Sequence, residues 1–209
     1  MVKYKTVLKD AIVEQIIDKS RFIGHVKSVE TREAAEDFFA EIRTRHRSAT
    51  HNVTAYVIGE KFEFQWASDD GEPQGTSGAP MVQMLVKEGI TNVALVITRY
   101  FGGIKLGTGG LVRAYTSTAK LALDEAKICQ VKELIVLTIK IDYTFHGKLM
   151  NLAQNGQFQL RNSTFEDVVT VELTTDPEST NEIKTLVSNI TGGSSIIVSE
   201  SKELVKVKI

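Results

Sequence analysis

The chain has 209 residues, of which 42% are hydrophobic and 24% charged, and its formal net charge is -1. This composition supports an ordinary folded core, and it excludes a disordered chain and nucleic-acid binding through bulk positive charge. The single cysteine, Cys129, excludes an intrachain disulfide and a thiolate zinc cage, so a reducing, cytoplasmic setting is expected. We expect neither a secretory signal nor a membrane partner, because no apolar run is long enough for either.

The first half of the chain predicts strands and helices in mixed order. Asp18-Lys19-Ser20 suits a hairpin turn between two apolar segments. Thr31 is the expected N-cap of a helix that ends near His46, and Pro80 fits the first turn of a second helix. A third helix is expected to follow a glycine-rich loop and to end near Ala126. The expected strands span residues 11–17, 21–29, 53–58, 62–66 and 93–97.

The second half has a different pattern. Apolar residues alternate over 132–141, and those of 183–190 follow the spacing of one helix face. The remaining expected elements are a helix near 145–152 and strands at 159–165, 168–173, 195–199 and 204–209. The order β-α-β-β-α-β is that of the ferredoxin-like split βαβ unit. We therefore predict an α+β protein with one domain over residues 1–128 and a ferredoxin-like domain over residues 132–209.

Five glycines and three cations lie close together after the strand at 93–97. A strand, a glycine loop and a helix start present backbone N–H groups to an anion, although neither standard phosphate fingerprint is present. We predict an anion-binding site here, with Arg113 in the first turn of the helix. The alternative is that the glycines serve tight packing alone. The predicted anion-binding residues are Arg99, Gly102, Gly103, Lys105, Gly107, Gly109, Gly110 and Arg113.

A second candidate region is the acidic loop formed by Asp69, Asp70 and Glu72. Three carboxylates in four residues can bind a metal, orient a cation or act as a general base, but they are also common in a solvated turn.

Three further site candidates are His51, Tyr100 and Tyr115, and the two tyrosines could stack on bases. His46 and His51 have no third ligand near them in sequence, so no metal site is predicted. No side chain is singled out as a nucleophile, and no catalytic residue or cofactor is assigned.

Three segments together resemble the YigZ/IMPACT family: HRSATHNVTAY, SDDGEPQGTSGAPM and ITRYFGGIKLGTGGLVRAY. The family commonly has Pro-Asp where this chain has Arg47 and Ser48. The resemblance implies an IMPACT-type N-terminal domain, with a fold like the second domain of a small-subunit ribosomal protein. It also implies a C-terminal domain similar to the last domain of elongation factor G. Eukaryotic members of that family regulate translation through protein partners, so a cytoplasmic, translation-linked role is expected.

Two functions from different classes fit these features. The first is a regulator that binds RNA, the ribosome or a ribosome-associated partner through the basic glycine loop. The second is an enzyme that acts on a phosphorylated small molecule. In the enzyme, the glycine loop would hold the phosphate, Arg113 would balance its charge, and Asp70 or Glu72 would serve as base or magnesium ligand.

Overall fold

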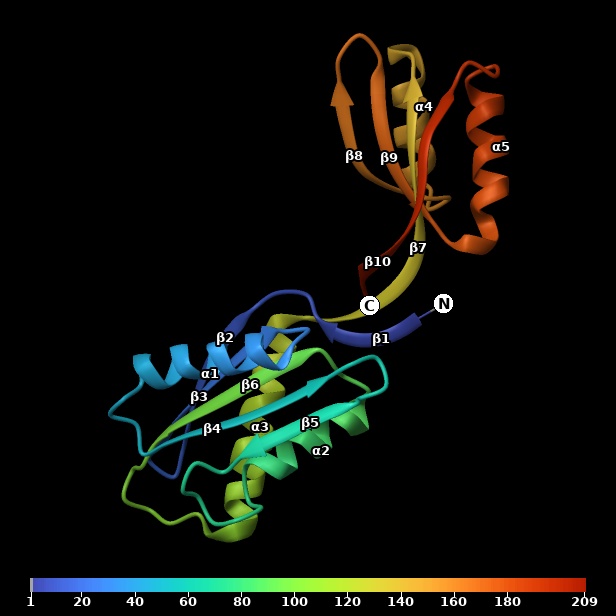
Figure 1. Cartoon of the computed structure of the whole chain (residues 1–209). Coiled ribbons are helices and arrows are strands. Elements are labelled where there is room, and N and C mark those ends of the chain that lie inside the picture. The colour runs from blue at the N-terminus through green and yellow to red at the C-terminus, as the bar shows by residue number, and fades with distance from the viewer. Residues whose placement is uncertain (1) are drawn as a thin grey trace. The chain divides into compact units, whose positions relative to one another are not determined.

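The computed structural model describes residues 2–209, and the chain divides into two compact units (Figure 1). The first unit contains residues 3–131 together with residues 206–209. The second contains residues 132–205 together with Val2. Within the described residues, no helix has the length and apolar character needed to span a bilayer.

The first unit is built on an antiparallel sheet of five strands in the order β2-β3-β6-β4-β5. Two helices cover one face of this sheet and one helix covers the other (Figure 1). The strands are β2 (Ala11–Ile17), β3 (Ser20–Ser28), β4 (His51–Ile58), β5 (Phe64–Ser68) and β6 (Val93–Tyr100). The helices are α1 (Arg32–Arg45) on one face, and α2 (Gly78–Glu88) and α3 (Gly107–Ala126) on the other.

Alternating side chains divide the core of the first unit between the two faces of the sheet. Leu95 and Ile97 of β6 pack with α2 and α3, whereas Ala94 and Val96 of the same strand pack with α1. Both sets are fully buried, which explains why residues 93–97 form a continuous apolar run.

Local signals in the sequence are confirmed at two element ends. Asp18 and Lys19 form the turn between β2 and β3 with positive φ angles of 44° and 62°, the backbone geometry that suits a two-residue hairpin. Thr31 caps α1, since its Oγ1 accepts a hydrogen bond of 3.1 Å from the Ala34 N–H.

The start of α3 differs from the prediction. The helix begins at Gly107, so Gly107, Gly109 and Gly110 form its first turn instead of the end of a loop. Arg113 therefore lies in the second turn. The glycine run concealed this helix start because glycine is a poor helix former.

The second unit has the predicted element order β-α-β-β-α-β. Its strands lie in the order β10-β7-β9-β8, and β1 (Val2–Val7), which the sequence pattern did not predict, also pairs with β7. Ile135, Leu137 and Ile139 of β7 pack with α4 and α5 to form the core. The elements are β7 (Ile128–Ile141), α4 (Tyr143–Gln154), β8 (Gln159–Phe165), β9 (Val169–Thr175), the 3-10 turn η1 (Pro177–Ser179), α5 (Thr180–Ile190) and β10 (Ile196–Lys208).

The chain returns to the first unit at its end. Lys206 Nζ donates hydrogen bonds to the Val7 carbonyl oxygen at 2.9 Å and to Ser28 Oγ at 3.1 Å. The domain limits 1–128 and 132–209, and the likeness of the second unit to the last domain of elongation factor G, stay predictions.

Candidate functional site

One end of the first sheet collects most of the predicted site residues. β3 and β4 begin there and β6 ends there, because His51 is paired with Arg99, and Arg21 with Tyr100. The loop of residues 69–77, which follows β5, and the segment that leads into α3 meet the same end of the sheet (Figure 1). We call this region the sheet-end site.

A buried cluster of Glu72, Arg99 and Tyr115 forms the interior of the sheet-end site. Arg99 Nη1 and the Tyr115 hydroxyl both donate to Glu72 Oε1 at 2.7 Å. The side chains of Arg99 and Glu72 are 5% and 4% exposed. Burial raises the pKa of Tyr115 far above its usual range, and the adjacent Glu72 carboxylate raises it further. The phenol therefore remains protonated and serves as a donor.

This cluster changes the interpretation of two predicted residues. The positive charge of Arg99, assigned to anion binding, is already balanced by Glu72, which was assigned to the acidic loop. Tyr115 has no exposed surface, and Phe22 contacts its ring edge-on with ring centres 5.4 Å apart. Tyr115 thus offers no face on which a base could stack, and its hydroxyl instead holds the Glu72 carboxylate.

Ser20 connects this cluster to the glycine loop. Its Oγ accepts hydrogen bonds from Arg99 Nη2 at 3.3 Å and from the Gly102 N–H at 3.2 Å. A Cβ at Gly102 would lie 2.0 Å from the backbone of Lys19, so glycine is required there for close backbone approach. The sequence analysis placed Ser20 in a turn, and no motif marked it as part of a site.

The other glycines of the loop have different explanations. Gly103 and Gly107 adopt positive φ angles of 87° and 71°, which other residues rarely tolerate. A Cβ at Gly110 would lie 3.0 Å from the Cβ of Leu106. Gly109 has no positive φ, and among the described residues no atom lies within 4 Å of where its Cβ would be. Neither packing nor backbone geometry accounts for glycine at position 109.

The N-terminus of α3 is open to a ligand. Within residues 2–209, no side chain caps this helix, and its first turn contains no acidic residue. Lys105, just before the helix, and Arg113, in its second turn, are both exposed. Free N–H groups at a helix start, with cations beside them, attract an anion.

Asp69 holds the acidic loop against the start of α2. Its carboxylate accepts hydrogen bonds from the N–H groups of Gly75 at 2.7 Å, Gly78 at 2.8 Å and Ser77 at 3.2 Å, and from Ser77 Oγ at 2.7 Å. Burial opposes ionisation of Asp69, but these four hydrogen bonds outweigh that effect and lower its pKa. Asp69 is therefore committed to the structure of the loop.

Asp70 orients His51. Asp70 Oδ2 accepts from the Asn52 N–H at 2.6 Å, and the Asp70 carbonyl oxygen lies 2.8 Å from His51 Nδ1. Because a carbonyl only accepts hydrogen bonds, Nδ1 carries the proton, and in the neutral ring Nε2 keeps its lone pair. His51 Nε2 lies 3.8 Å from Glu72 Oε1. Within the described residues, no three His, Cys, Asp or Glu side chains gather in a way that could hold a metal ion.

Tyr100 belongs to the other face of the sheet. Its hydroxyl lies 3.0 Å from His46 Nδ1, and the guanidinium of Arg21 lies 5.5 Å from the centre of its ring. Ala94 and Val96 lie on the same face of β6 as Tyr100, and their packing with α1 shows which side of the sheet this is. Tyr100 is therefore separated by the sheet from the cluster of Glu72, Arg99 and Tyr115.

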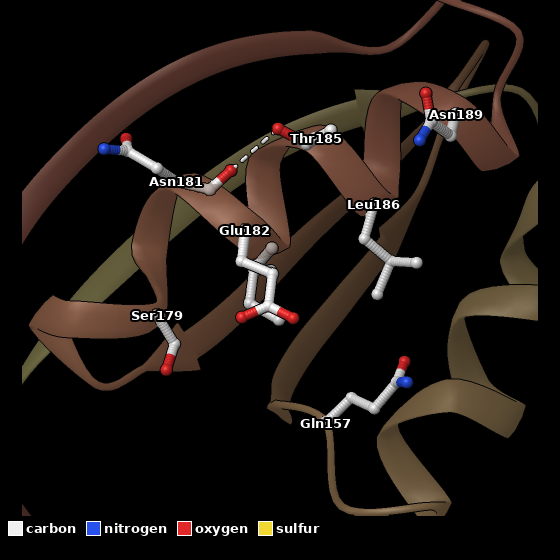
Figure 2. Close-up of a pocket in the computed structure, with 8 residues that line it drawn as sticks. Gln157, Ser179, Asn181, Glu182, Thr185, Leu186 and Asn189 are labelled. Carbon is white, nitrogen blue, oxygen red and sulfur yellow. Dashed lines mark hydrogen bonds between the residues drawn. The ribbon is translucent and has the colours of Figure 1, made fainter.

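The second unit has a hollow of about 610 Å³ beside α5 (Figure 2). Glu182 and Leu186 extend from the helix toward Gln157, which lies in the turn after α4. The lining contains several amide and hydroxyl groups and one carboxylate, but no cation. It does not match the charge of a phosphate, and none of the predicted site residues lies in it.

Comparison with known proteins bears on this site directly. The Impact N-terminal domain family matches residues 18–123. The Bacillus subtilis protein named IMPACT family member YvyE is 40% identical over 194 residues, which is 93% of this chain and 89% of that protein. The chain belongs to the IMPACT family. The resemblance found in the sequence is thereby confirmed.

Two more matches agree with this IMPACT-family assignment. Escherichia coli IMPACT family member YigZ is 40% identical over 134 residues, which is 63% of this chain and 65% of that protein. A crystal structure described as that of an hypothetical protein is 29% identical, with a TM-score of 0.59, and covers 97% of this chain and 100% of its own. The mixed α+β fold is confirmed, and the region from Ser20 to Tyr115 that forms the sheet-end site lies within the matched IMPACT domain.

Proposed function

We propose that this IMPACT-family protein regulates translation in the cytoplasm by binding RNA at the start of α3. The observation that carries the proposal is Gly109. Glycine inside a helix costs up to about 1 kcal/mol relative to alanine, and nothing in the described surroundings of Gly109, in the first turn of α3, explains why glycine stands there. A glycine at this position lets an RNA phosphate approach the helix N–H groups closely.

The available positive charge supports the same position. Arg99 is neutralised by Glu72, whereas the exposed Lys105 and Arg113 have no ion pair among the described residues. Two phosphate contacts predict weak, salt-dependent binding, because each contact releases condensed counterions from the RNA. The translation role rests on the family resemblance, in which eukaryotic members regulate translation.

Replacing Lys105 or Arg113 with alanine is expected to weaken RNA binding. Each change should also reduce the slope of log K against log salt by about 1, since it removes one phosphate contact. Fluorescence anisotropy of a labelled single-stranded RNA across a salt series measures both effects. Lys120→Ala is the matched control, because Lys120 is an exposed residue further along α3, 3.7 Å from Glu88. Equal effects of all three changes, or no binding at low salt, would exclude this site.

Gly109→Ala separates binding from folding. The free energy of unfolding is expected to rise by about 0.5–1 kcal/mol, because alanine favours the helix and the new methyl group meets open space. RNA affinity is expected to fall, since that methyl group occupies the position where the phosphate approaches. A more stable variant with unchanged affinity would show that RNA does not contact the start of α3.

His51 favours a second candidate function, that of an enzyme acting on a phosphorylated small molecule. Its Nδ1 proton is held by the Asp70 carbonyl oxygen, so Nε2 is free to accept a proton. Glu72 is less suited to that role because Arg99 and Tyr115 both bind its Oε1. A thermal-shift panel of nucleotides and sugar phosphates with Mg²⁺ distinguishes the two functions. Stabilisation by one compound that is lost in His51→Gln favours the enzyme, and no hit favours the RNA-binding regulator.

A further inference from the structure

β10 forms an edge of the sheet in the second unit and has apolar residues on both of its faces. It pairs with β7, and no other strand within residues 2–209 pairs with β10 (Figure 1). Ile196, Ile197 and Val198 are 63%, 45% and 53% exposed. Because successive side chains in a strand point to opposite faces, both faces are uncovered here. An unpaired strand with exposed β-branched residues is ready to pair with another strand.

We propose that the occupant of this edge is β10 of a second copy of the chain, paired antiparallel about a two-fold axis at Ser201. The sheet would then continue from one copy into the other. Such an axis runs perpendicular to the sheet and keeps each side chain on its own face. Opposed residues must therefore both have even numbers or both have odd numbers, so the axis passes through a residue and never between two.

The sequence of β10 is self-complementary about Ser201. Opposite charges face each other on the two sides of the axis, and two apolar pairs follow further out. Cross-strand pairs of both kinds stabilise antiparallel sheets. Of the five pairs that flank the axis within β10, three match in this way: Glu200 with Lys202, Val198 with Leu204, and Ile197 with Val205. The other two oppose Ser199 with Glu203 and Ile196 with Lys206.

Neighbouring registers of the same antiparallel pairing are not self-complementary in this way. An axis at Glu200 places two Glu200 carboxylates against each other and opposes Ile197 with Glu203. An axis at Ser199 opposes Val198 with Glu200. Like charges opposed directly, or an apolar residue opposed to a carboxylate, destabilise an antiparallel pair. Among these alternatives, the axis at Ser201 alone gives an oppositely charged pair together with two apolar pairs.

The charged side chains near the axis can accept a partner from the second copy. Glu200 Oε2 already lies 2.6 Å from Lys184 Nζ, and Lys202 Nζ lies 4.0 Å from Glu133 Oε1. The Glu200 and Lys202 side chains are nevertheless 42% and 69% exposed. Leu204, which would face Val198 of the second copy, is 51% exposed.

A charge-reversal cycle on the full chain tests this register. Sedimentation velocity from about 5 to 200 µM should show a dimer whose fraction rises with concentration. Glu200→Lys and Lys202→Glu should each weaken association by about tenfold or more. Residue 200 of each copy faces residue 202 of the other, so either change creates two pairs of like charges in the dimer. The double variant should return to within about threefold of the wild type. Lys148→Glu, on the exposed face of α4, is the control and should leave association unchanged.

Ser201→Cys gives an independent readout in a variant that keeps all the charges. Cys129 is buried, so the new thiol would be the accessible one. Mild oxidation should produce a dimer linked between the two copies of position 201, detected by mass spectrometry, whereas Lys148→Cys should give none. A wild-type chain that remains monomeric across the concentration range would overturn the proposal. The proposal would also be overturned if neither Glu200→Lys nor Lys202→Glu weakened the dimer, or if the double variant did not restore it.

Discussion

Replacing Glu72 with alanine is expected to lower the free energy of unfolding of the first unit by about 3–5 kcal/mol. The change leaves the Arg99 guanidinium buried without its counter-charge, since Arg99 Nη1 donates to Glu72 Oε1 at 2.7 Å. It also removes the acceptor of the Tyr115 hydroxyl, which has no exposed surface. A buried charge without a partner cannot recover in the folded state the hydration that it has when the chain unfolds.

Urea unfolding followed by the fluorescence of Trp66 measures this loss. Trp66 is the sole tryptophan and lies on β5, so it reports on the first unit. The matched control is Glu14→Ala, which breaks an exposed ion pair of 2.8 Å with Arg21 and should change stability by less than about 1 kcal/mol.

A double change to apolar residues distinguishes the loss of the ion pair as a whole from the cost of leaving Arg99 buried without its partner. Glu72→Leu combined with Arg99→Met should recover much of the lost free energy of unfolding. Apolar packing can often replace a buried ion pair, whereas removal of one partner leaves the other charge buried and uncompensated. A loss below about 1 kcal/mol in Glu72→Ala would mean that Arg99 finds another partner or water.

The parts of the fold that the sequence predicted correctly are those with local causes. The cap at Thr31 depends on one hydroxyl and a neighbouring N–H group, and the turn at Asp18 and Lys19 depends on a short polar segment between two apolar strands. Alternation over residues 132–141 predicts one buried face of β7, and Ile135, Leu137, Ile139 and Ile141 on that face belong to the core of the second unit.

The interior of the candidate site could not be predicted in the same way. The ion pair between Glu72 and Arg99 joins a loop to a strand 27 residues further along the chain. It forms because the pairing of β4 with β6 sets His51 opposite Arg99, and that register depends on the whole sheet. The sequence analysis assigned Arg99 to a basic loop and Glu72 to a separate acidic loop. In the fold these two residues form an ion pair, and Lys105 and Arg113 remain exposed.

His25 shows how a buried polar group escapes sequence analysis altogether. It lies on β3 with 2% of its surface exposed, and neither ring nitrogen has a hydrogen-bond partner among the described residues. Burial is the main cause that lowers the pKa of His25 to about 4, and the nearby His46 and Arg45 contribute to the same shift. No motif marks it, since its neighbours in β3 are ordinary strand residues.

Acid is therefore expected to destabilise the first unit through His25. In the unfolded chain this histidine takes up a proton near its ordinary pKa of 6.5, whereas in the folded chain it resists until about pH 4. As the pH falls through this window the unfolded state binds more protons, so the free energy of unfolding falls. The loss from His25 approaches about 3 kcal/mol near the lower end of the window and then stops growing. Burial also lowers the pKa of His46, which adds to the loss.

Two variants separate this protonation effect from the cost of an unsatisfied buried group. His25→Leu should be more stable than the wild type near pH 7, and its advantage should grow as the pH falls to about 4.5. Thr54→Val is the matched control, because the Thr54 hydroxyl is also buried without a partner among residues 2–209 but carries no titrating proton. It should raise stability by the same amount at every pH. If urea unfolding of His25→Leu gave the same pH dependence as the wild type, water would have to reach the His25 ring, and the acid sensitivity would arise elsewhere.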